Sequence, residues 1–533
     1  MKKRVLLILL AVLMTLGAVL GCADRYPEMD VTETPDKNYA VTSNGGMVVQ
    51  KGDFIYFING YKSVVDLDGK NNVWGKVEKG GIYYAKLTEG KSVQVSDYYG
   101  QYITYDNSEN NLFDEEFSGF VTENRTYKDE NDEEQTKQQI AVKPVVSKLI
   151  TNGGYENGGL YIIDDYIYYA TPTTKKNKKG EVQYNLVDFF RTRIDGKGTQ
   201  YLYTSKDANA KPVYGYYKYN DSVYAVFYEP SQQKIYSVQI TKNKVKKPVV
   251  LAEKVTSAIL PQKSVYYEGI SQDMPEDYIY YTRDIDIKTD TESEGNILER
   301  VRPDGSERKK ILSGVDIILD KVYNGHLFYY VDGFKSSANK HYFAKDLTKE
   351  GEPVSIFYEP SDSFPVNVYG LVVYENDLLA LATKGSSTVL YIAGENAGKV
   401  VLNKKSIILY ADENNAYFVE DTSEGDQKVT DAELLHINFF ANMDSAQKES
   451  QKIAEANIKA NFLKVDVAAG YIFYISTANE IVQTINKDGE DVTVLAETDY
   501  YVRLQHLSSP TNVEWDMGWL DKMNYPKNED KES

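Results

Sequence analysis

Two segments that share a strand and a turn constrain the fold of this chain more than any other feature. Asp165–Tyr169 is followed by the pair Asp195-Gly196, and Asp277–Tyr281 is followed at nearly the same interval by Asp304-Gly305. Tyrosine and isoleucine favour strands, and Asp-Gly supplies the positive φ of a tight hairpin. The two segments therefore predict a repeated β-unit.

Similar turns recur along the chain, mostly at steps of about 47 residues. They fall at Glu89-Gly90, Asp195-Gly196, Lys242-Asn243, Asp304-Gly305, Lys349 to Gly351, Asn396 to Gly398, Met443-Asp444 and Asp488-Gly489. Further strands are expected between turns, at Val223 to Tyr228, Lys234 to Ile240, Val249 to Leu251 and Val265 to Tyr267. This pattern predicts an all-β fold, a β-propeller of seven or eight four-stranded blades over residues 38–505. A β-solenoid would have shorter repeats, and two β-sandwiches would not give a regular period.

The repeat phrases also resemble a known family. Phe189–Lys197 and Leu298–Ser306 are similar to the repeats of the bacterial extracytoplasmic family DUF5050, which is related in pattern to propeller repeats of the low-density-lipoprotein-receptor type. Asp53–Gly60 and Gly75–Gly81 resemble the amino-terminal signature of that family. The resemblance covers most of residues 45–500 and implies a propeller fold. It implies no catalytic residue, and the Tyr-Trp-Thr-Asp tetrad of the receptor propellers is absent.

Three segments depart from the repeat. Residues 107–139 are acidic and polar, and we expect an inserted loop or hairpin with a solvated tip at Asp129–Glu134. Ser445–Phe462 places Ile453 and its apolar neighbours among charges, which predicts a short helical insert over about residues 445–462. Residues 506–533 are expected to form a closing segment and a polar tail.

The amino terminus has the organisation of an export signal. Lys2–Arg4 precede an uncharged run, Val5–Gly21, which Cys22 ends. Val19–Cys22 resembles the bacterial lipobox, and this implies cleavage before Cys22 and a diacylglycerol on its sulfur. Residues 1–21 are then a signal peptide, and residues 22–37 a lipidated cysteine with a flexible tether. An uncleaved anchor is one alternative, although the run is at the lower limit for a span, and an ordinary signal peptide is another.

Composition excludes several classes of protein. One cysteine and 4 histidines exclude a disulfide scaffold, a zinc ribbon and an iron–sulfur site. A net charge of −19 argues against nucleic acid as a partner. We expect attachment to the extracytoplasmic face of the cell membrane through the lipid, with an envelope protein, peptide or glycan as ligand. No cofactor or metal is expected, and the oligomeric state stays open.

No catalytic motif stands out. His326, His341, His436 and His506 lack metal-site spacing, so isolated histidines are expected, although a composite site in the propeller channel stays open. Asp66–Asn71 has the character of a polar turn more than of a calcium loop. Asp284, Asp286, Asp290 and Glu292 are expected to form a solvated hairpin, with a cation site as the alternative.

Tyrosine is the most suggestive binding feature, with 46 in the chain. Tyr214, Tyr216, Tyr217 and Tyr219 are the candidate ligand-binding residues, because aromatic faces stack on sugars. The same spacing also fits packing between blades, with hydroxyl groups reaching solvent.

These observations predict a membrane-anchored propeller that acts as a binding or scaffolding module. The alternative is a propeller-type hydrolase or lyase acting on envelope polysaccharide or peptide, which would require two or more of the histidines to meet acids in the channel. A transporter's substrate-binding lipoprotein would be a two-lobed α/β protein, and the chain has little helix signal.

Overall fold

The fold is a β-propeller. The computed structural model describes segments of residues 31–516, with longer gaps at 105–119, 147–158, 421–431 and 439–450, and beyond residue 358 it describes strands alone. The described elements are strands, apart from two short 3-10 helices, η1 (Pro230–Gln232) and η2 (Pro275–Asp277). The predicted all-β fold is confirmed.

Six blades are four-stranded antiparallel sheets. Blade 2 consists of β12 (Tyr161–Ile163), β13 (Tyr166–Pro172), β14 (Val187–Arg193) and β15 (Gln200–Thr204). Blade 3 consists of β16 (Val213–Tyr219), β17 (Ser222–Glu229), β18 (Lys234–Ile240) and β19 (Val249–Glu253). Blade 4 consists of β20 (Val255–Ile259), β22 (Ile279–Asp284), β23 (Asn296–Val301) and β24 (Lys309–Gly314). Blade 5 consists of β25 (Ile317–Tyr323), β26 (His326–Asp332), β27 (Lys340–Asp346) and β28 (Val354–Tyr358). Blade 6 consists of β29 (Val366–Tyr374), β30 (Asp377–Lys384), β31 (Ser387–Ile392) and β32 (Lys399–Leu402). Blade 7 consists of β33 (Ser406–Ala411), β34 (Asn415–Glu420), β35 (Ala432–Asn438) and β36 (Gln451–Ala456).

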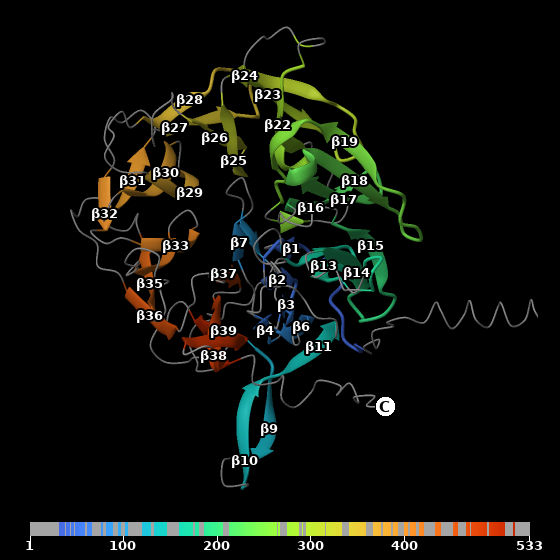
Figure 1. The fold of residues 1–533 in the computed structure, drawn as a ribbon, viewed down its shortest axis with the longest axis vertical. Helices are drawn as coiled ribbons and strands as arrows, with labels where there is room; N and C mark the ends of the chain where they lie inside the picture. The colour runs from blue at the N-terminus through green and yellow to red at the C-terminus, as the bar shows by residue number, and fades with distance from the viewer. Residues whose placement is uncertain are drawn as a thin grey trace, which may run out of the picture.

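The first and last blades are larger and close the ring. Blade 1 has the strand order β11 (Val142–Val146), β6 (Ile82–Lys86), β3 (Phe54–Ile58), β2 (Val48–Lys51), β1 (Val41–Thr42) and β21 (Val265–Tyr266). Blade 8 has β37 (Val465–Ala468), β38 (Tyr471–Lys487), β39 (Glu490–His506), β4 (Tyr61–Asp66) and β5 (Lys76–Val77), and β40 (Trp515–Asp516) also pairs with β39. β37, at the inner edge of blade 8, touches β2 of blade 1, so the ring closes between these blades (Figure 1). Of the seven or eight blades expected, the described strands form eight.

All but one of the predicted turns fall between the third and fourth strands of a blade. Asp195-Gly196 joins β14 to β15 and Asp304-Gly305 joins β23 to β24, with φ of 79° at Gly196 and 91° at Gly305. These positive φ values are the reason that glycine recurs there. The turns near residues 89, 396, 443 and 488 lie outside the described residues, but the first three fall between third and fourth strands. Residue 488 instead lies between the second and third strands of blade 8.

One local expectation was wrong, and another was confirmed for the strand but not for its pairing. The helical insert at about residues 445–462 contains β36, which pairs with β35 through Ala432 opposite Ala456 and Glu433 opposite Glu455. The apolar spacing there also fits a helix, but pairing with the exposed edge of β35 prevails over that local preference. Val265–Tyr267 does contain the expected strand, β21, but β21 pairs with β1 of blade 1 and not with the strands that precede it in the chain.

The acidic insertion contains a hairpin. β9 (Thr122–Lys128) pairs with β10 (Glu134–Ile140) as a separate two-stranded sheet. Figure 1 shows this hairpin projecting outward from the ring beside blade 1. The hairpin form of the prediction is confirmed, and the tip at residues 129–132 lies outside the described residues. A second small ribbon pairs β7 (Gln94–Ser96) with β8 (Tyr102–Thr104).

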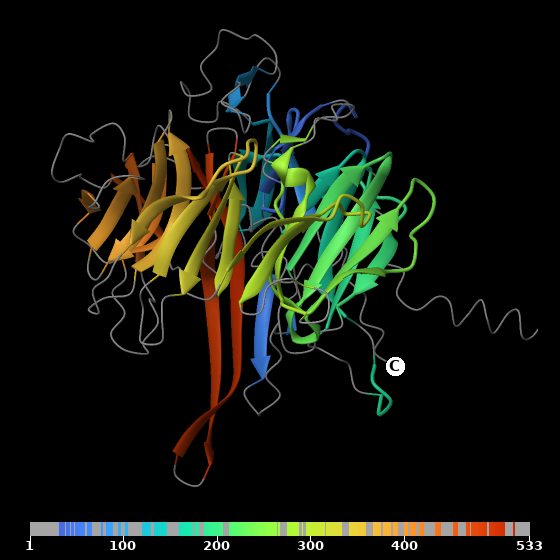
Figure 2. The same cartoon turned by 90° about the horizontal axis from the view of Figure 1, so that it is seen from above.

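The two faces of the ring differ in their connections. In a four-stranded meander, the turns between strands one and two and between strands three and four lie on the same side. We call this side the turn face. The connection between strands two and three lies on the opposite face, where β38 and β39 extend well past the other strands with β4 beside them (Figure 2).

Candidate functional site

The centre of the ring is partly covered by two segments of the chain. β1 extends blade 1 inward and pairs with β21, which belongs to the connection between the first two strands of blade 4. The Asn44 side chain donates to the Ile162 carbonyl at 3.0 Å and accepts from the Ile162 amide at 2.8 Å, on the innermost strand of blade 2. The Tyr216 amide of blade 3 donates to Gln262 Oε1 at 3.4 Å. Backbone groups on the inner edges of blades 2 and 3 are therefore hydrogen-bonded to two inserted segments, one around Asn44 and one around Gln262.

Gly159 shows how closely one inserted segment approaches blade 2. Its φ is +84°, and a Cβ at this position would collide with the backbone oxygens of Gly45 and Gly46. The same segment exchanges backbone hydrogen bonds of 2.8 Å, from Gly45 to Leu160 and from Leu160 to Gly46. A glycine is required here by both conformation and space.

We expect Gly159→Ala to detach the segment around Gly45 from blade 2. The collision is with backbone, which cannot move aside as a flexible side chain can, and the positive φ adds strain of about 1 kcal/mol. Hydrogen exchange at the amides of Gly45 and Leu160 measures this, and both should exchange faster. Gly180→Ala is the control, because its φ is also +84° but nothing lies within 4 Å. Equal protection in both variants would contradict the expectation.

The candidate tyrosines lie mainly between blades. Tyr214, Tyr216 and Tyr217 are 3%, 1% and 4% exposed, and Tyr219 is partly buried. Tyr214 and Tyr216 belong to a core cluster shared by blades 2 and 3, and Tyr217 to one shared by blades 3 and 4. Arg302 stacks over the Tyr219 ring at 5.0 Å. The structure thus places three of the four in the packing role, with no face open to a sugar.

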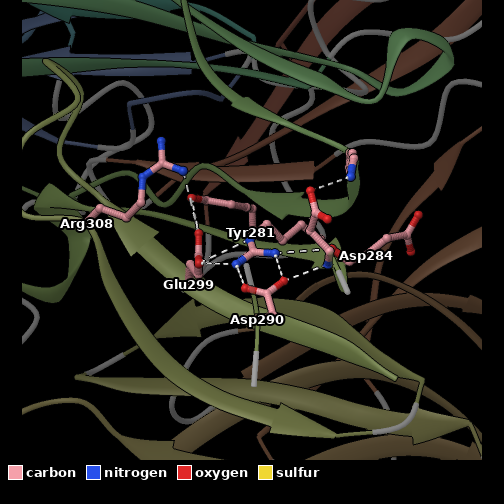
Figure 3. A network of polar contacts seen from close by, with 8 residues as sticks. Tyr281, Asp284, Asp290, Glu299 and Arg308 are labelled. Atoms are coloured by element: carbon pink, nitrogen blue, oxygen red, sulfur yellow. Dashed lines mark hydrogen bonds and ion pairs between the residues drawn. The ribbon is translucent and has the colours of Figure 1, made fainter. Parts of the chain in front are cut away.

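The acidic residues of blade 4 form a polar network with arginine (Figure 3). Arg283 donates to both oxygens of Asp290, at 2.7 and 2.9 Å, and to Glu299 Oε1 at 2.9 and 3.1 Å. The Tyr281 hydroxyl donates to Glu299 Oε2, and Arg308 Nη1 lies 3.7 Å from the same oxygen. Asp286 is bonded to Lys254 at 3.0 Å. Arg283, Arg308 and Lys254 therefore pair with the carboxylates of Asp290, Glu299 and Asp286.

The charges of the network stabilise one another. Hydrogen bonds from Arg283 and from the Asp286 amide hold the pKa of Asp290 well below its usual range. Burial, followed by the bond to Glu299, raises the pKa of Tyr281, which stays a neutral donor. Among the described residues, no three histidines, cysteines or acids gather as a metal site. The solvated hairpin expected here is in fact tied to blade 4 by ion pairs, and Glu292 lies outside the described residues.

The four histidines all lie on second or third strands. His326 begins β26, and its Nε2 is 3.9 Å from Asp346 of β27. His341 in β27 bonds to Ser355 at 2.8 Å, and burial lowers its pKa. His436 lies in β35 and His506 ends β39. The first strand of each blade lines the central channel of a propeller. Because the four histidines lie on second and third strands, these strands do not bring them together in the channel, as the enzyme alternative would require.

The predicted tether is in contact with the ring over its last residues. Val31 is buried, and its amide donates to the Asp195 carbonyl at 3.3 Å. Glu33 lies 3.9 Å from Lys86. The buried Lys51 donates to the carbonyls of Lys37 at 3.2 Å and Asp164 at 2.8 Å. Residues 31–37, expected to be flexible, are thus held on blades 1 and 2.

Cys22 and the rest of residues 1–30 lie outside the described residues, as do residues 67–71 of the Asp66–Asn71 turn. Within the part of the chain that is described, no helix is long and apolar enough to cross a membrane. Sequence reasoning missed Asn44 and Gln262, because nothing local distinguishes them from other polar loop residues. It also treated Lys242–Lys247 only as a turn, although four lysines in a chain of this net charge were a visible signal.

No protein-family profile matches the chain, and no curated protein matches it either. Several solved structures are similar. The β-propeller domain of the trilobed protease from Pyrococcus furiosus is 11% identical over 63% of this chain and 92% of that domain, with a TM-score of 0.33. TolB from Acinetobacter baumannii is 10% identical over 84% of this chain and 81% of its own, with a TM-score of 0.28. An acylaminoacyl peptidase from Pyrococcus horikoshii is 12% identical, with a TM-score of 0.34, over 62% of this chain but only 51% of the peptidase. These identities transfer no residue role or activity.

Proposed function

We propose that this protein is a lipid-anchored β-propeller that presents a binding or scaffolding surface on the extracytoplasmic face of the cell membrane. The proposal starts from the lipobox-like Val19–Cys22 and the resemblance to DUF5050 repeats. The observation that carries it is the attachment of the chain to the ring from Val31 onward. Val31 is only nine positions after Cys22, so the two lie at most about 30 Å apart. The ring is therefore presented close to the lipid.

The opposite face supplies the elements for binding. β38 and β39 project there as a long hairpin, and β4 pairs with Leu495–Tyr500 of β39 (Figure 2). A β-propeller is a rigid support for such projections, since each blade packs on its neighbours. We propose an envelope protein, peptide or glycan as the ligand of this projection or of the β9–β10 hairpin. The direct search is a pull-down from envelope extracts beside a glycan panel, with the full chain as bait.

We expect Cys22→Ala to move the chain out of the membrane fraction in its bacterial host. A thioether-linked diacylglycerol supplies two acyl chains, which suffice for stable attachment, and alanine cannot accept them. Cell fractionation with mass spectrometry of the amino-terminal peptide measures both location and lipid. Inhibition of the lipoprotein signal peptidase should leave the wild-type precursor uncleaved. Unchanged processing and membrane retention in Cys22→Ala would refute the anchor.

A further inference from the structure

A basic segment with exposed apolar side chains lies at the outer edge of the turn face. Blade 3 exposes Lys242, Lys244, Lys246 and Lys247 in its last turn, with no acid between residues 241 and 250. Val249 and Val250 follow at the start of β19 and are 55% and 46% exposed. Valine is usually buried, so two adjacent exposed valines beside lysines are informative.

The corresponding turns of the neighbouring blades also carry cations, beside Asp195 in blade 2 and beside Asp304 and Glu307 in blade 4. In blade 2, Lys197 is exposed and Tyr201 at the start of β15 is 46% exposed. In blade 4, Arg308 to Lys310 are exposed at the start of β24. We call residues 197–201, 242–250 and 308–310 together the basic rim.

Contacts between blades make the basic rim continuous. The buried Arg191 of blade 2 donates to the carbonyls of Thr241 and Lys242 in blade 3, at 3.1 and 3.3 Å. From the other side, Arg308 of blade 4 donates to the Leu251 carbonyl, and Ser237 of blade 3 donates to the Pro303 carbonyl at 2.6 Å. The three turns therefore lie next to one another and are held in fixed positions.

The chain from the lipid attachment arrives at the same place. Val31 is bonded to Asp195, which belongs to the last turn of blade 2 and precedes Lys197 by two residues. The nine residues before Val31 keep this turn within about 30 Å of Cys22. The chain as a whole has a net charge of −19, so most of its surface is repelled by an anionic surface. Only a local basic area can face such a surface without that cost.

We infer that the basic rim lies against the anionic lipid surface of the membrane that holds the anchor. This inference rests on the proposed function and adds an orientation to it. The lysines attract acidic lipid headgroups, and Val249, Val250 and Tyr201 enter the interface. The turn face of blades 2–4 is then next to the membrane, and β38 and β39 point away from it.

The test uses single-cysteine labelling of the full lipidated chain. Because Cys22 carries the lipid, a cysteine introduced elsewhere is the one free thiol of the mature protein. Asn243→Cys labels the basic rim, and Lys178→Cys labels an exposed position in the β13–β14 connection on the opposite face. A fluorescent label is then quenched by lipids with nitroxide headgroups, in vesicles with or without phosphatidylglycerol. We expect quenching about threefold greater at 243 than at 178 when phosphatidylglycerol is present.

The chain offers a matched charge control. The β13–β14 connection also contains four lysines in sequence, and Lys176, Lys178 and Lys179 are described and exposed on the opposite face. Reversing Lys242, Lys244 and Lys247 to Glu should abolish the extra quenching at 243, and reversing Lys176, Lys178 and Lys179 in the chain labelled at 243 should leave it unchanged. Equal quenching at 243 and 178 in a lipidated chain would overturn the orientation and leave the anchor intact. A free thiol at Cys22, seen by mass spectrometry, would overturn the anchor and this inference together. If the lysines serve only to keep the β19 edge from pairing with another chain, Glu will serve equally well and the reversal will leave the quenching at 243 unchanged, which also overturns the inference.

Discussion

Tyr216→Ala is expected to lower the free energy of unfolding by about 4 kcal/mol. The ring is 1% exposed and lies 4.9 Å from the Tyr161 ring and 4.7 Å from the Tyr168 ring, measured between centroids. Removing it leaves a cavity between blades 2 and 3 that rigid sheets cannot fill. Urea unfolding followed by tyrosine fluorescence measures the change.

Tyr216→Phe separates packing from hydrogen bonding. The Tyr216 hydroxyl is buried without a hydrogen-bond partner among the described residues, so its loss should cost nothing or stabilise the fold slightly. Tyr214→Phe is the matched comparison. Its hydroxyl accepts from the Gly159 amide at 3.0 Å and donates to the Gly159 carbonyl at 3.2 Å, and we expect a loss of about 1 kcal/mol. If Tyr216→Ala were as stable as wild type, the packing role would be refuted and the ligand-binding interpretation would gain support.

Arg283→Met should lower the stability of the fold by about 3 kcal/mol. The Arg283, Asp290 and Glu299 side chains are only 18%, 10% and 9% exposed. Methionine keeps most of the volume but removes the guanidinium that bonds to both carboxylates, leaving Glu299 only the more distant Arg308 at 3.7 Å. Breaking a largely buried pair in this way is strongly destabilising. The midpoint of urea denaturation, with slopes compared between variants, is the measurement.

The same variant should respond differently to acid. The pKa of Asp290 is depressed in the folded state, so the ionised carboxylate stabilises the fold above its unfolded pKa of about 4. That contribution disappears as the pH falls through the lower folded pKa. The stability difference between wild type and Arg283→Met should therefore shrink in strong acid. Arg193→Met is the control, because its side chain is 53% exposed and its pair with Asp195 should contribute less than about 1 kcal/mol at any pH. Similar losses in the two variants would contradict the network's role.

Much of the architecture was readable from local signals. Aromatic strands such as Asp165–Tyr169 and Asp-Gly turns such as Asp195-Gly196 have local causes, so they predicted both the β-rich repeat and the place of the turns. A further local signal was available. The turn between first and second strands repeats as Gly52-Asp53, Asp164-Asp165 and Asn220-Asp221, with positive φ at Gly52, Asp164 and both residues of the third turn. Counting these turns would have indicated the blades more directly.

Local sequence patterns were enough to predict a β-propeller with about 47 residues per unit and a lipobox-like Cys22 ahead of it. The contact between β37 and β2 that closes the ring, and the partners of β21 and β36, became visible in the folded chain alone. The tertiary structure also decided that Tyr216 packs rather than faces solvent, and that the lysines of blade 3 join those of blades 2 and 4. Local and tertiary features differ in how far apart along the chain the interacting residues lie. Turn and strand preferences act over a few neighbouring residues, whereas strand pairing, burial and a shared charged surface depend on residues that only the closed ring brings together.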